Sequence, residues 1–454
     1  MLKKICLIIS IIAMCQNVYA ANLAELANMA LERNLQIKIA ELEIEQSLID
    51  EKNAHNAMIP NVNFTIGRNF NEYYDRYQRG LNQAENTWTY SLKLTQNYPG
   101  LGKVPAIQKQ ISALKTEIKK VHNENYKLGI LRNLTKIYFQ LVKDQEMVKI
   151  HETDLRLIEE LLKVAKLNEE VGLVLHNDVL RIEVEQHNSD SELIKARGDY
   201  ATQIFDLAAI LDIDDPYSIQ LDLPKSLKFA SEEYSGRDLI KELFSLDYDI
   251  NLANKDLEIL EKVVKQSEKA MLPTLSLNST YTYGNKYGSD RGGKDNKNLV
   301  TTFELVTPVY DSNDLKNAVR TAKKSEEIGK LTLENLQNNK KSSLEKALKN
   351  YNDALARIIL AEKMVEQSYE NMRIVFTRYQ EGAASIVELV DAQRLLTNSS
   401  QTATSAYYDE RTAKAEILLL THRFDELYKM DINPIMPKRE NILTASLNLT
   451  GEEE

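Results

Sequence analysis

The sequence has 454 residues, with 57 basic and 67 acidic side chains and a formal net charge of −10. This acidic balance argues against nucleic-acid binding, which needs clustered lysines and arginines. A mean hydropathy of −0.40 argues against a polytopic helical membrane protein. Only 15 glycines and 9 prolines occur in the whole length. Long continuous helices are therefore favoured, because both residue types destabilise a helix interior.

The first 20 residues have the pattern of a secretory signal peptide. Lys3 and Lys4 precede an apolar stretch that is too short to span a bilayer, and a small-residue site ends at Ala20. Cleavage near Ala20 would remove both cysteines of the chain, Cys6 and Cys15, so we expect a mature protein without disulfides. Lipidation of Cys15 is not expected, because the preceding residue is a methionine rather than a small residue.

The chain contains an internal duplication. Residues 57–64, AMIPNVNF, recur as AMLPTLSL at 270–277, which is 213 positions further on. Gly172 matches Gly382 at an offset of 210, and loop insertions explain the small difference. Two halves of about 210 residues are therefore expected to share one order of elements: helix, strand pair, long helix, tip and returning helix.

Each half contains two segments in which apolar and polar residues alternate. A period of two predicts strands, and segments of this length with aromatic residues near their ends are typical of outer-membrane strands. Polar loops at 75–86 and 288–297 separate the members of each pair. The predicted strands are 61–74, 87–98, 274–287 and 298–310.

Heptad repeats fill most of the remaining chain. Leu134 and Leu141 belong to a seven-residue series in the first half, and Leu344, Tyr351 and Ile358 begin another in the second. Sustained heptads predict helices that supercoil against neighbours. A helix of this length is about 100 Å long, far more than the thickness of a bilayer core. Its polar faces indicate exposure to water. The expected long and returning helices are 104–171, 176–212, 312–381 and 385–424.

These patterns predict a mainly α protein with a membrane β-barrel component. The expected organisation is a signal peptide at 1–20, a first repeat at 21–212, an irregular segment at 213–236, a second repeat at 237–424 and an irregular tail at 425–454. Four strands cannot close a spanning barrel, and open sheet edges are not tolerated in lipid. Several copies must then complete one barrel. Two, three or four copies would give eight, twelve or sixteen strands.

The sequence resembles the TolC-like outer-membrane efflux protein family along essentially the whole mature chain. The resemblance rests on Met58-Ile-Pro60 and Met271-Leu-Pro273 before strands, and on the tip motifs that begin at Val171 and Tyr379. It implies a homotrimer with a twelve-stranded outer-membrane barrel in lipid and a coiled-coil α-helical barrel in the periplasm. It also implies a passive exit duct without a cofactor, metal or catalytic residue, which works with a periplasmic adaptor protein and an inner-membrane pump.

Two residues are candidates for the pore constriction. Glu388 and Asp391 are three positions apart, so they lie on one helix face. Around a symmetric axis such residues would form a carboxylate ring that attracts cations and resists crowding. Both match the constriction carboxylates of the family, although the first is Glu instead of Asp. The alternative is an ordinary solvated acidic helix face.

The resemblance also assigns roles to the two tips. Asp178 and Tyr379 match a pair that ties neighbouring coiled coils in the closed state, while Asp178 alone could instead cap a helix. Ala384 stands where family members carry a locking arginine. Adaptor contacts are expected at the tips, at Gly172, Leu173, Val174, Gly382 and Ala383.

Two other classes of protein remain as alternatives. A soluble periplasmic coiled-coil scaffold would use the four strands in a water-soluble sheet. An exported hydrolase would need a nucleophile or metal site, and the sequence contains neither GxSxG nor HExxH.

Overall fold

A computed structural model describes residues 19–73, 83–172, 174–216, 219–221, 236–287, 296–428 and 430. These residues form two compact units, and each unit combines segments from both halves of the sequence. The first unit comprises Met1–Ile37, Asn125–Asp247 and Asn338–Glu454, and the second comprises Lys38–Glu124 and Tyr248–Gln337. The division into repeats at 21–212 and 237–424 is therefore a division of the sequence, and it remains a prediction as a division into domains.

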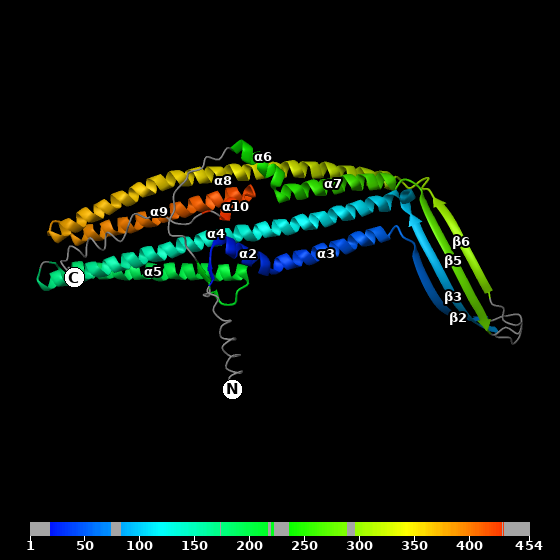
Figure 1. The fold of residues 1–454 in the computed structure, drawn as a ribbon, viewed down its shortest axis with the longest axis horizontal. Helices are drawn as coiled ribbons and strands as arrows, with labels where there is room; N and C mark the ends of the chain where they lie inside the picture. The colour runs from blue at the N-terminus through cyan, green and yellow to red at the C-terminus, as the bar shows by residue number, and fades with distance from the viewer. Residues whose placement is uncertain are drawn as a thin grey trace, which may run out of the picture. The chain divides into compact units, whose positions relative to one another are not determined.

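The two halves run through the same order of elements (Figure 1). Each has two short or medium helices, a strand pair, one very long helix and one returning helix. The first half contains α2 Leu23–Arg33, α3 Leu35–Asn56, α4 Lys103–Glu170 and α5 His176–Leu211. The second contains α6 Gly236–Leu246, α7 Tyr248–Lys269, α8 Asp314–Gln380, α9 Ile386–Leu420 and α10 Phe424–Tyr428. Within the described part of the chain, none of these helices has the length and apolar character needed to cross a membrane.

The long helices bury the positions that the heptads select. In α8, which has 67 residues, Leu344, Tyr351 and Ile358 are each less than 5% exposed. A second row of small residues is buried beside them, and Ser368 on this row shares a 2.6 Å hydrogen bond with Ser399 of α9. Small side chains at the seam allow α8 and α9 to approach closely, as the sequence predicts.

Four antiparallel strands form one sheet in the order β2-β3-β5-β6, and the central β3–β5 pairing joins the two halves of the chain. The strands are β2 Asn61–Tyr73, β3 Gln83–Tyr98, β5 Thr274–Tyr287 and β6 Asn296–Val306. β3 begins inside the predicted loop 75–86. β6 ends before residue 310, because Pro308 has no N–H to donate to a ladder. Residues 74–82 and 288–295 lie outside the described part of the chain.

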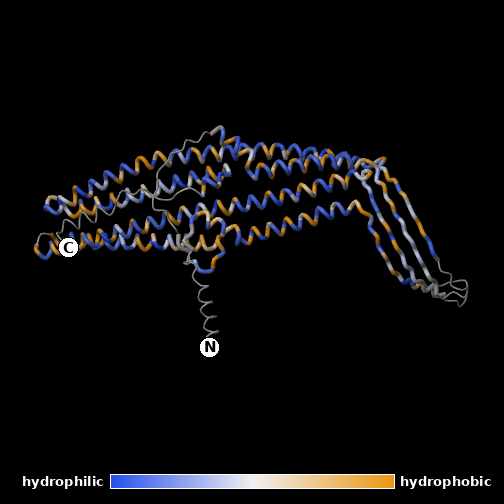
Figure 2. The backbone as a smooth tube through the Cα atoms, viewed as in Figure 1, coloured by the Kyte–Doolittle hydropathy of each residue, from blue (hydrophilic) through white to orange (hydrophobic). Residues whose placement is uncertain are grey.

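Hydrophilic and hydrophobic residues follow one another along the strands (Figure 2), and the strand register gathers them on one apolar and one polar face. Register places Phe64 opposite Leu92, Leu92 opposite Tyr281, and Tyr281 opposite Leu299, so these side chains share one face. This face is uncovered: Phe64 is 64% exposed and Leu299 is 65% exposed. The other face carries asparagine, threonine and serine at the alternate positions. The predicted alternation is confirmed on all four strands.

A closely packed turn connects the sheet to α4. Pro99–Gly102 form a short 3-10 turn in which Gly100 has φ +59°. A Cβ on Gly100 would lie 2.4 Å from the carbonyl oxygen of Lys269, so only glycine fits there. The N–H of Leu101 donates to the carbonyl of Pro273 at 2.9 Å. This turn therefore fixes the start of α4 against the segment that enters β5.

Two short strands in the first unit were not predicted. β1 Tyr19–Ala21 pairs in parallel with β4 Ile219–Leu221, inside the segment 213–236 that the sequence indicated as irregular. The predicted cleavage near Ala20 falls within β1, while residues 1–18 lie outside the described part of the chain. In the predicted irregular tail, α10 forms a short helix, and residues 431–454 are not described.

Candidate gate and docking tips

Glycine reverses the chain at both helical tips. Gly172 has φ +78° between α4 and α5, and Gly382 has φ +71° between α8 and α9. A Cβ at either position would meet nothing within 4 Å, so the requirement is conformational and not one of space. Val174 and Ala383 follow these turns, and Leu173 lies outside the described part of the chain.

A polar cap holds the second tip. Ser385 is the N-cap of α9; its hydroxyl accepts from the N–H of Glu388 at 3.2 Å, and the Glu388 carboxylate accepts from the N–H of Ser385 at 3.3 Å. Arg378 donates to the carbonyl of Ala383 at 3.0 Å and lies 3.4 Å from the Glu388 carboxylate. Glu388 is therefore a capping-box residue with a guanidinium beside it, and not an isolated pore carboxylate. Arg378 also brings a cation to the turn where Ala384 replaces the expected arginine.

The first tip has no such cap. The N-cap of α5 is Leu175, which makes no side-chain capping bond, so Asp178 does not cap the helix as the alternative reading expected. Asp178 lies in the first turn, where a carboxylate interacts favourably with the helix dipole. Val171 and Leu175 are 69% and 73% exposed. This tip exposes apolar side chains and is bridged by the 2.8 Å pair of His176 Nδ1 and the Glu169 carboxylate, whereas the second tip has a capping box.

One hydrophobic core joins the four helices behind the tips. It contains side chains from α4, α5, α8 and α9, among them Ile158, Ile182, Met372 and Leu389. Tyr379 packs against this core. Because this core lies within the first unit, the two tips belong to one packed end of that unit.

Asp178 and Tyr379, the two residues of the predicted tether, interact electrostatically within one chain. Burial raises the pKa of the Tyr379 phenol, and the nearby Asp178 carboxylate raises it further, while Asn168 lowers it. Among the described residues, the hydroxyl oxygen of Tyr379 has no partner that meets hydrogen-bond geometry. The pair is therefore close within one chain without being hydrogen-bonded there.

A groove of about 350 Å³ runs between α5 and α9 beside the tips. Its charged lining residues are Arg181 and Glu185 on α5 and Asp391 and Arg394 on α9. Asp391 is one of the two predicted gate residues, and its charge raises the pKa of Arg394, although less than Glu185 does. The groove thus contains two cations and two anions, and Asp391 is not part of a purely acidic surface.

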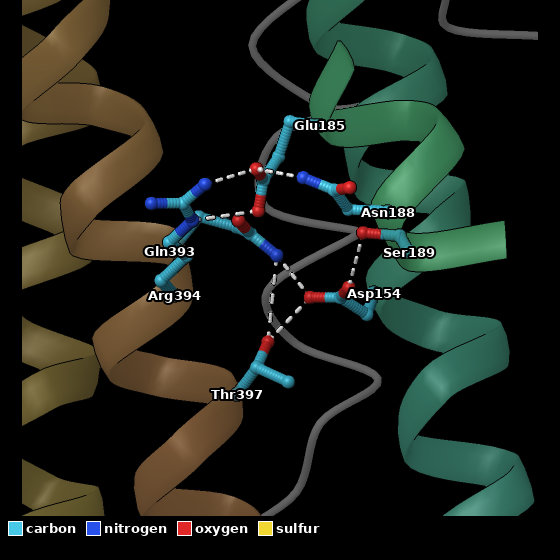
Figure 3. A network of polar contacts seen from close by, with 7 residues as sticks. All are labelled: Asp154, Glu185, Asn188, Ser189, Gln393, Arg394 and Thr397. Atoms are coloured by element: carbon cyan, nitrogen blue, oxygen red, sulfur yellow. Dashed lines mark hydrogen bonds and ion pairs between the residues drawn. The ribbon is translucent and has the colours of Figure 1, made fainter. Parts of the chain in front are cut away.

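A buried polar network crosses from the first hairpin to the second at this level (Figure 3). The Arg394 Nε donates to Glu185 at 2.7 Å, and its Nη2 forms a second bond to the same carboxylate. The Asp154 carboxylate of α4 accepts hydrogen bonds from Gln393 and Thr397 of α9 and, at 2.8 Å, from Ser189 of α5. Three helices are therefore joined through one carboxylate.

The electrostatics of this network follow from its charges. The hydrogen bonds from Arg394 lower the pKa of Glu185, whose burial acts in the opposite direction. The Glu185 side chain is only 9% exposed, whereas that of Arg394 is 52% exposed. Glu185 is thus held as a carboxylate inside the bundle by a cation at the bundle surface. Among the described residues, no group of three or more His, Cys, Asp or Glu side chains could hold a metal ion.

The sequence contained a signal for only part of this site. Ser385-x-x-Glu388 has the spacing of a capping box, so the cap could have been recognised in advance. The Glu185–Arg394 and Asp154–Gln393 contacts join residues more than 200 positions apart. No local pattern indicates such contacts, because they depend on how the two hairpins pack.

Comparison with known proteins agrees with this fold. Residues 239–421 match the family described as outer membrane efflux protein. The outer membrane protein TolC of Vibrio cholerae is 20% identical over 434 residues, which cover 92% of this chain and 94% of that protein. The solved structure of the Vibrio cholerae outer membrane protein VceC has a TM-score of 0.75 at 14% identity and covers 88% of this chain and 95% of that one. The Campylobacter jejuni CmeC outer membrane channel also reaches 0.75, at 16% identity, covering 94% and 89%.

These likenesses confirm the resemblance that the sequence indicated. Residues 239–421 carry the outer membrane efflux protein match, and nearly the whole chain is similar to TolC, an outer membrane protein. The mainly α fold with four strands is likewise confirmed.

Proposed function

We propose that this protein is the outer-membrane exit duct of a tripartite efflux or type I secretion system. In this proposal three copies form a passive channel that an adaptor and an inner-membrane pump open at its periplasmic tip. The four-stranded sheet is the observation that carries the proposal. Its apolar face is exposed on every strand, and β2 and β6 are its outer strands, with no further partner among the described residues.

Such a sheet is incomplete in a membrane. Open strand edges leave backbone N–H and C=O groups unpaired, and lipid cannot satisfy them. Pairing β6 of one copy with β2 of the next removes every edge. Three copies give twelve strands, an even number within the range of outer-membrane barrels. The polar face then lines a water-filled lumen and the apolar face meets lipid.

The helices support the periplasmic part of the proposal. α4 has 68 residues, which corresponds to about 100 Å of helix. Its surface and that of α8 carry exposed lysines and glutamates, which suit water and not hydrocarbon. Helices of this kind would extend the duct into the periplasm after removal of a signal peptide near Ala20.

The tips are proposed to hold the gate and the docking surface. Glu388 and Asp391 would lie at the constriction, each with a guanidinium of its own chain nearby, namely Arg378 and Arg394. Opening would then rearrange paired charges and would not simply separate like charges. Asp178 and Tyr379 would tether neighbouring hairpins. The exposed apolar first tip, around Gly172 and Val174, would meet the adaptor together with the turn at Gly382 and Ala383.

Cysteine cross-linking across the sheet edges tests the copy number. Because both natural cysteines precede Ala20, the mature chain offers a cysteine-free background. Thr65→Cys on β2 and Thr302→Cys on β6 share the polar face. We expect a short bismaleimide to give a ladder that ends at the trimer in native membranes. Each single variant is the control and should give no trimer.

The alternative function has its own signature in the same experiment. A periplasmic scaffold with a soluble sheet would be recovered without detergent. It would show no cross-link between outer strands of different copies. A ladder that ends at two or four copies would retain the barrel and overturn the trimer.

A further inference from the structure

The apolar face of the sheet changes character along its length. Near the helices it is mainly aliphatic, with Val62, Leu94, Leu277 and Leu305, and Phe303 and Tyr98 are the aromatic residues there. Toward the hairpin loops it becomes aromatic, with Phe70, Trp88, Tyr90 and Tyr283. Aromatic residues gather at bilayer interfaces because their rings are amphipathic.

Two cations lie on this face, both in the aromatic half. Arg68 is paired in register with Trp88, and Lys297 with Tyr283. The Arg68 guanidinium carbon lies 4.3 Å from the centre of the Phe70 ring and 5.1 Å from that of Trp88. Lys297 Nζ lies 5.9 Å from the centre of the Tyr283 ring, which itself lies 6.0 Å from the Tyr90 ring. Each cation is therefore held over aromatic rings on an otherwise apolar surface.

The opposite end of the face provides a contrast. No lysine or arginine occurs on its aliphatic half within the described strands, and Lys93 points to the polar face. A cation facing lipid is costly at mid-depth and nearly neutral at the interface. The positions of Arg68 and Lys297 thus mark the level of the headgroups on the loop side.

We propose that Arg68 and Lys297, with their aromatic neighbours, bind the phosphate of anionic lipid headgroups in the loop-side leaflet. The inference rests on the proposed function, because it requires the apolar face to meet lipid. A guanidinium can donate two hydrogen bonds to a phosphate while its flat face stacks on a ring. An ammonium contributes a point charge, and its aliphatic stem covers apolar surface. Charge complementarity therefore selects a phosphate-bearing anionic lipid as the occupant.

Trp88 reports directly on this surface, because it is the only tryptophan in the chain. The purified full-length mature protein is reconstituted in phosphatidylcholine vesicles that contain either brominated phosphatidylglycerol or brominated phosphatidylcholine at equal mole fraction. Bromine quenches a nearby indole, so quenching measures how often each lipid occupies the site. We expect the anionic lipid to be preferred by about fivefold, which corresponds to one basic residue near a charged membrane surface.

Matched variants separate the site from general electrostatics. Arg68→Gln combined with Lys297→Gln should reduce the preference to near unity, while Lys93→Gln, on the polar face, should leave it unchanged. High salt should weaken the preference in the wild type but not the quenching by brominated phosphatidylcholine.

The outcomes distinguish the two proposals. Equal quenching by both lipids in the wild type overturns the phosphate site and leaves the barrel in place. A preference that survives in the double variant also overturns it. Absence of quenching by either lipid shows that the face does not meet hydrocarbon, which overturns the proposed function itself.

Discussion

The α4–α5 and α8–α9 hairpins can be compared position by position, because 210 residues separate Gly172 from Gly382. The backbone of the two turns agrees, with a glycine at positive φ in each. The side chains at corresponding positions of the two hairpins differ in polarity. Leu175 corresponds to Ser385, so only the second hairpin has a capping box.

The divergence extends along both hairpins. Asp154 and Glu185 of the first correspond to Met364 and Leu395 of the second, both of them apolar. Arg394 of the second hairpin corresponds to Val184 of the first. The first hairpin thus supplies both acids of the network, and the second supplies the donors that reach them from across the interface, Gln393, Arg394 and Thr397. A duplication that kept both copies alike would have placed like charges face to face, so divergence allows the two hairpins to bind each other.

The largest expected effect concerns ion selectivity. Glu388→Gln combined with Asp391→Asn removes two charges per chain and keeps a glutamine that can serve the capping box. Arg378 then loses its nearby anion, and Arg394 keeps only Glu185, so we expect the cation preference of the channel to fall sharply. The reversal potential under a salt gradient in planar bilayers measures this.

The matched control uses the corresponding positions of the first hairpin. Asp178→Asn with Arg181→Gln leaves the net charge unchanged, so selectivity should stay as in the wild type. If both double variants behave alike, the acids of the second hairpin have no special place at the constriction.

The next effect tests the network. Asp154→Ala removes the acceptor shared by Ser189, Gln393 and Thr397, and an unsatisfied buried polar group costs about 1–3 kcal/mol. We expect amide exchange in the middle of α9 to accelerate by on the order of a hundredfold, since about 1.4 kcal/mol corresponds to a factor of ten. Met364→Ala, at the corresponding position, should cause far less, because Met364 is 45% exposed. Equal acceleration would show that side-chain volume and not the polar network matters here.

A smaller effect distinguishes the two tips. Ser385→Ala should weaken the start of α9 by about 1 kcal/mol through loss of the cap. Amide exchange in residues 385–389 would then accelerate about fivefold. The converse change, Leu175→Ser, should slow exchange at the start of α5 by a similar factor. If Leu175→Ser has no effect, the difference between the tips does not arise from capping.

Much of this architecture could be predicted from the sequence, because it rests on periodic patterns. Alternation indicated four strands, and heptads indicated the long helices. Pro308 shows a limit, since the expected strand continued past a residue that cannot donate to a ladder. The short β1–β4 pair could not be predicted, because strands of three residues have no measurable period.

For the candidate site, the sequence could predict which residues take part but not which side chains they contact. The spacing of Glu388 and Asp391 placed them on one helix face, yet their neighbouring cations Arg378 and Arg394 became apparent only in the structure. The Ser385 cap has a local signature, whereas the Asp154 network depends on the packing of separate helices. Long-range polar partners leave no trace in a local pattern.

The smallest expected effect is a pH dependence at the Glu185–Arg394 pair. Arg394 lowers the pKa of Glu185, so the carboxylate stabilises the folded hairpins above its ordinary pKa of about 4.3. This contribution is lost as the pH falls through the lowered value in the folded state. It should be about 1 kcal/mol or less, because the guanidinium is half exposed and screened by solvent. Glu185→Gln should therefore accelerate amide exchange in α5 at pH 7, but not at a pH below the pKa of Glu185 in the folded state.

Glu183→Gln provides the control, because its partner Lys166 lies on an exposed surface and the pair should contribute little at any pH. A difference between wild type and Glu185→Gln that persists unchanged into acid would show that the pair acts through packing and not through charge.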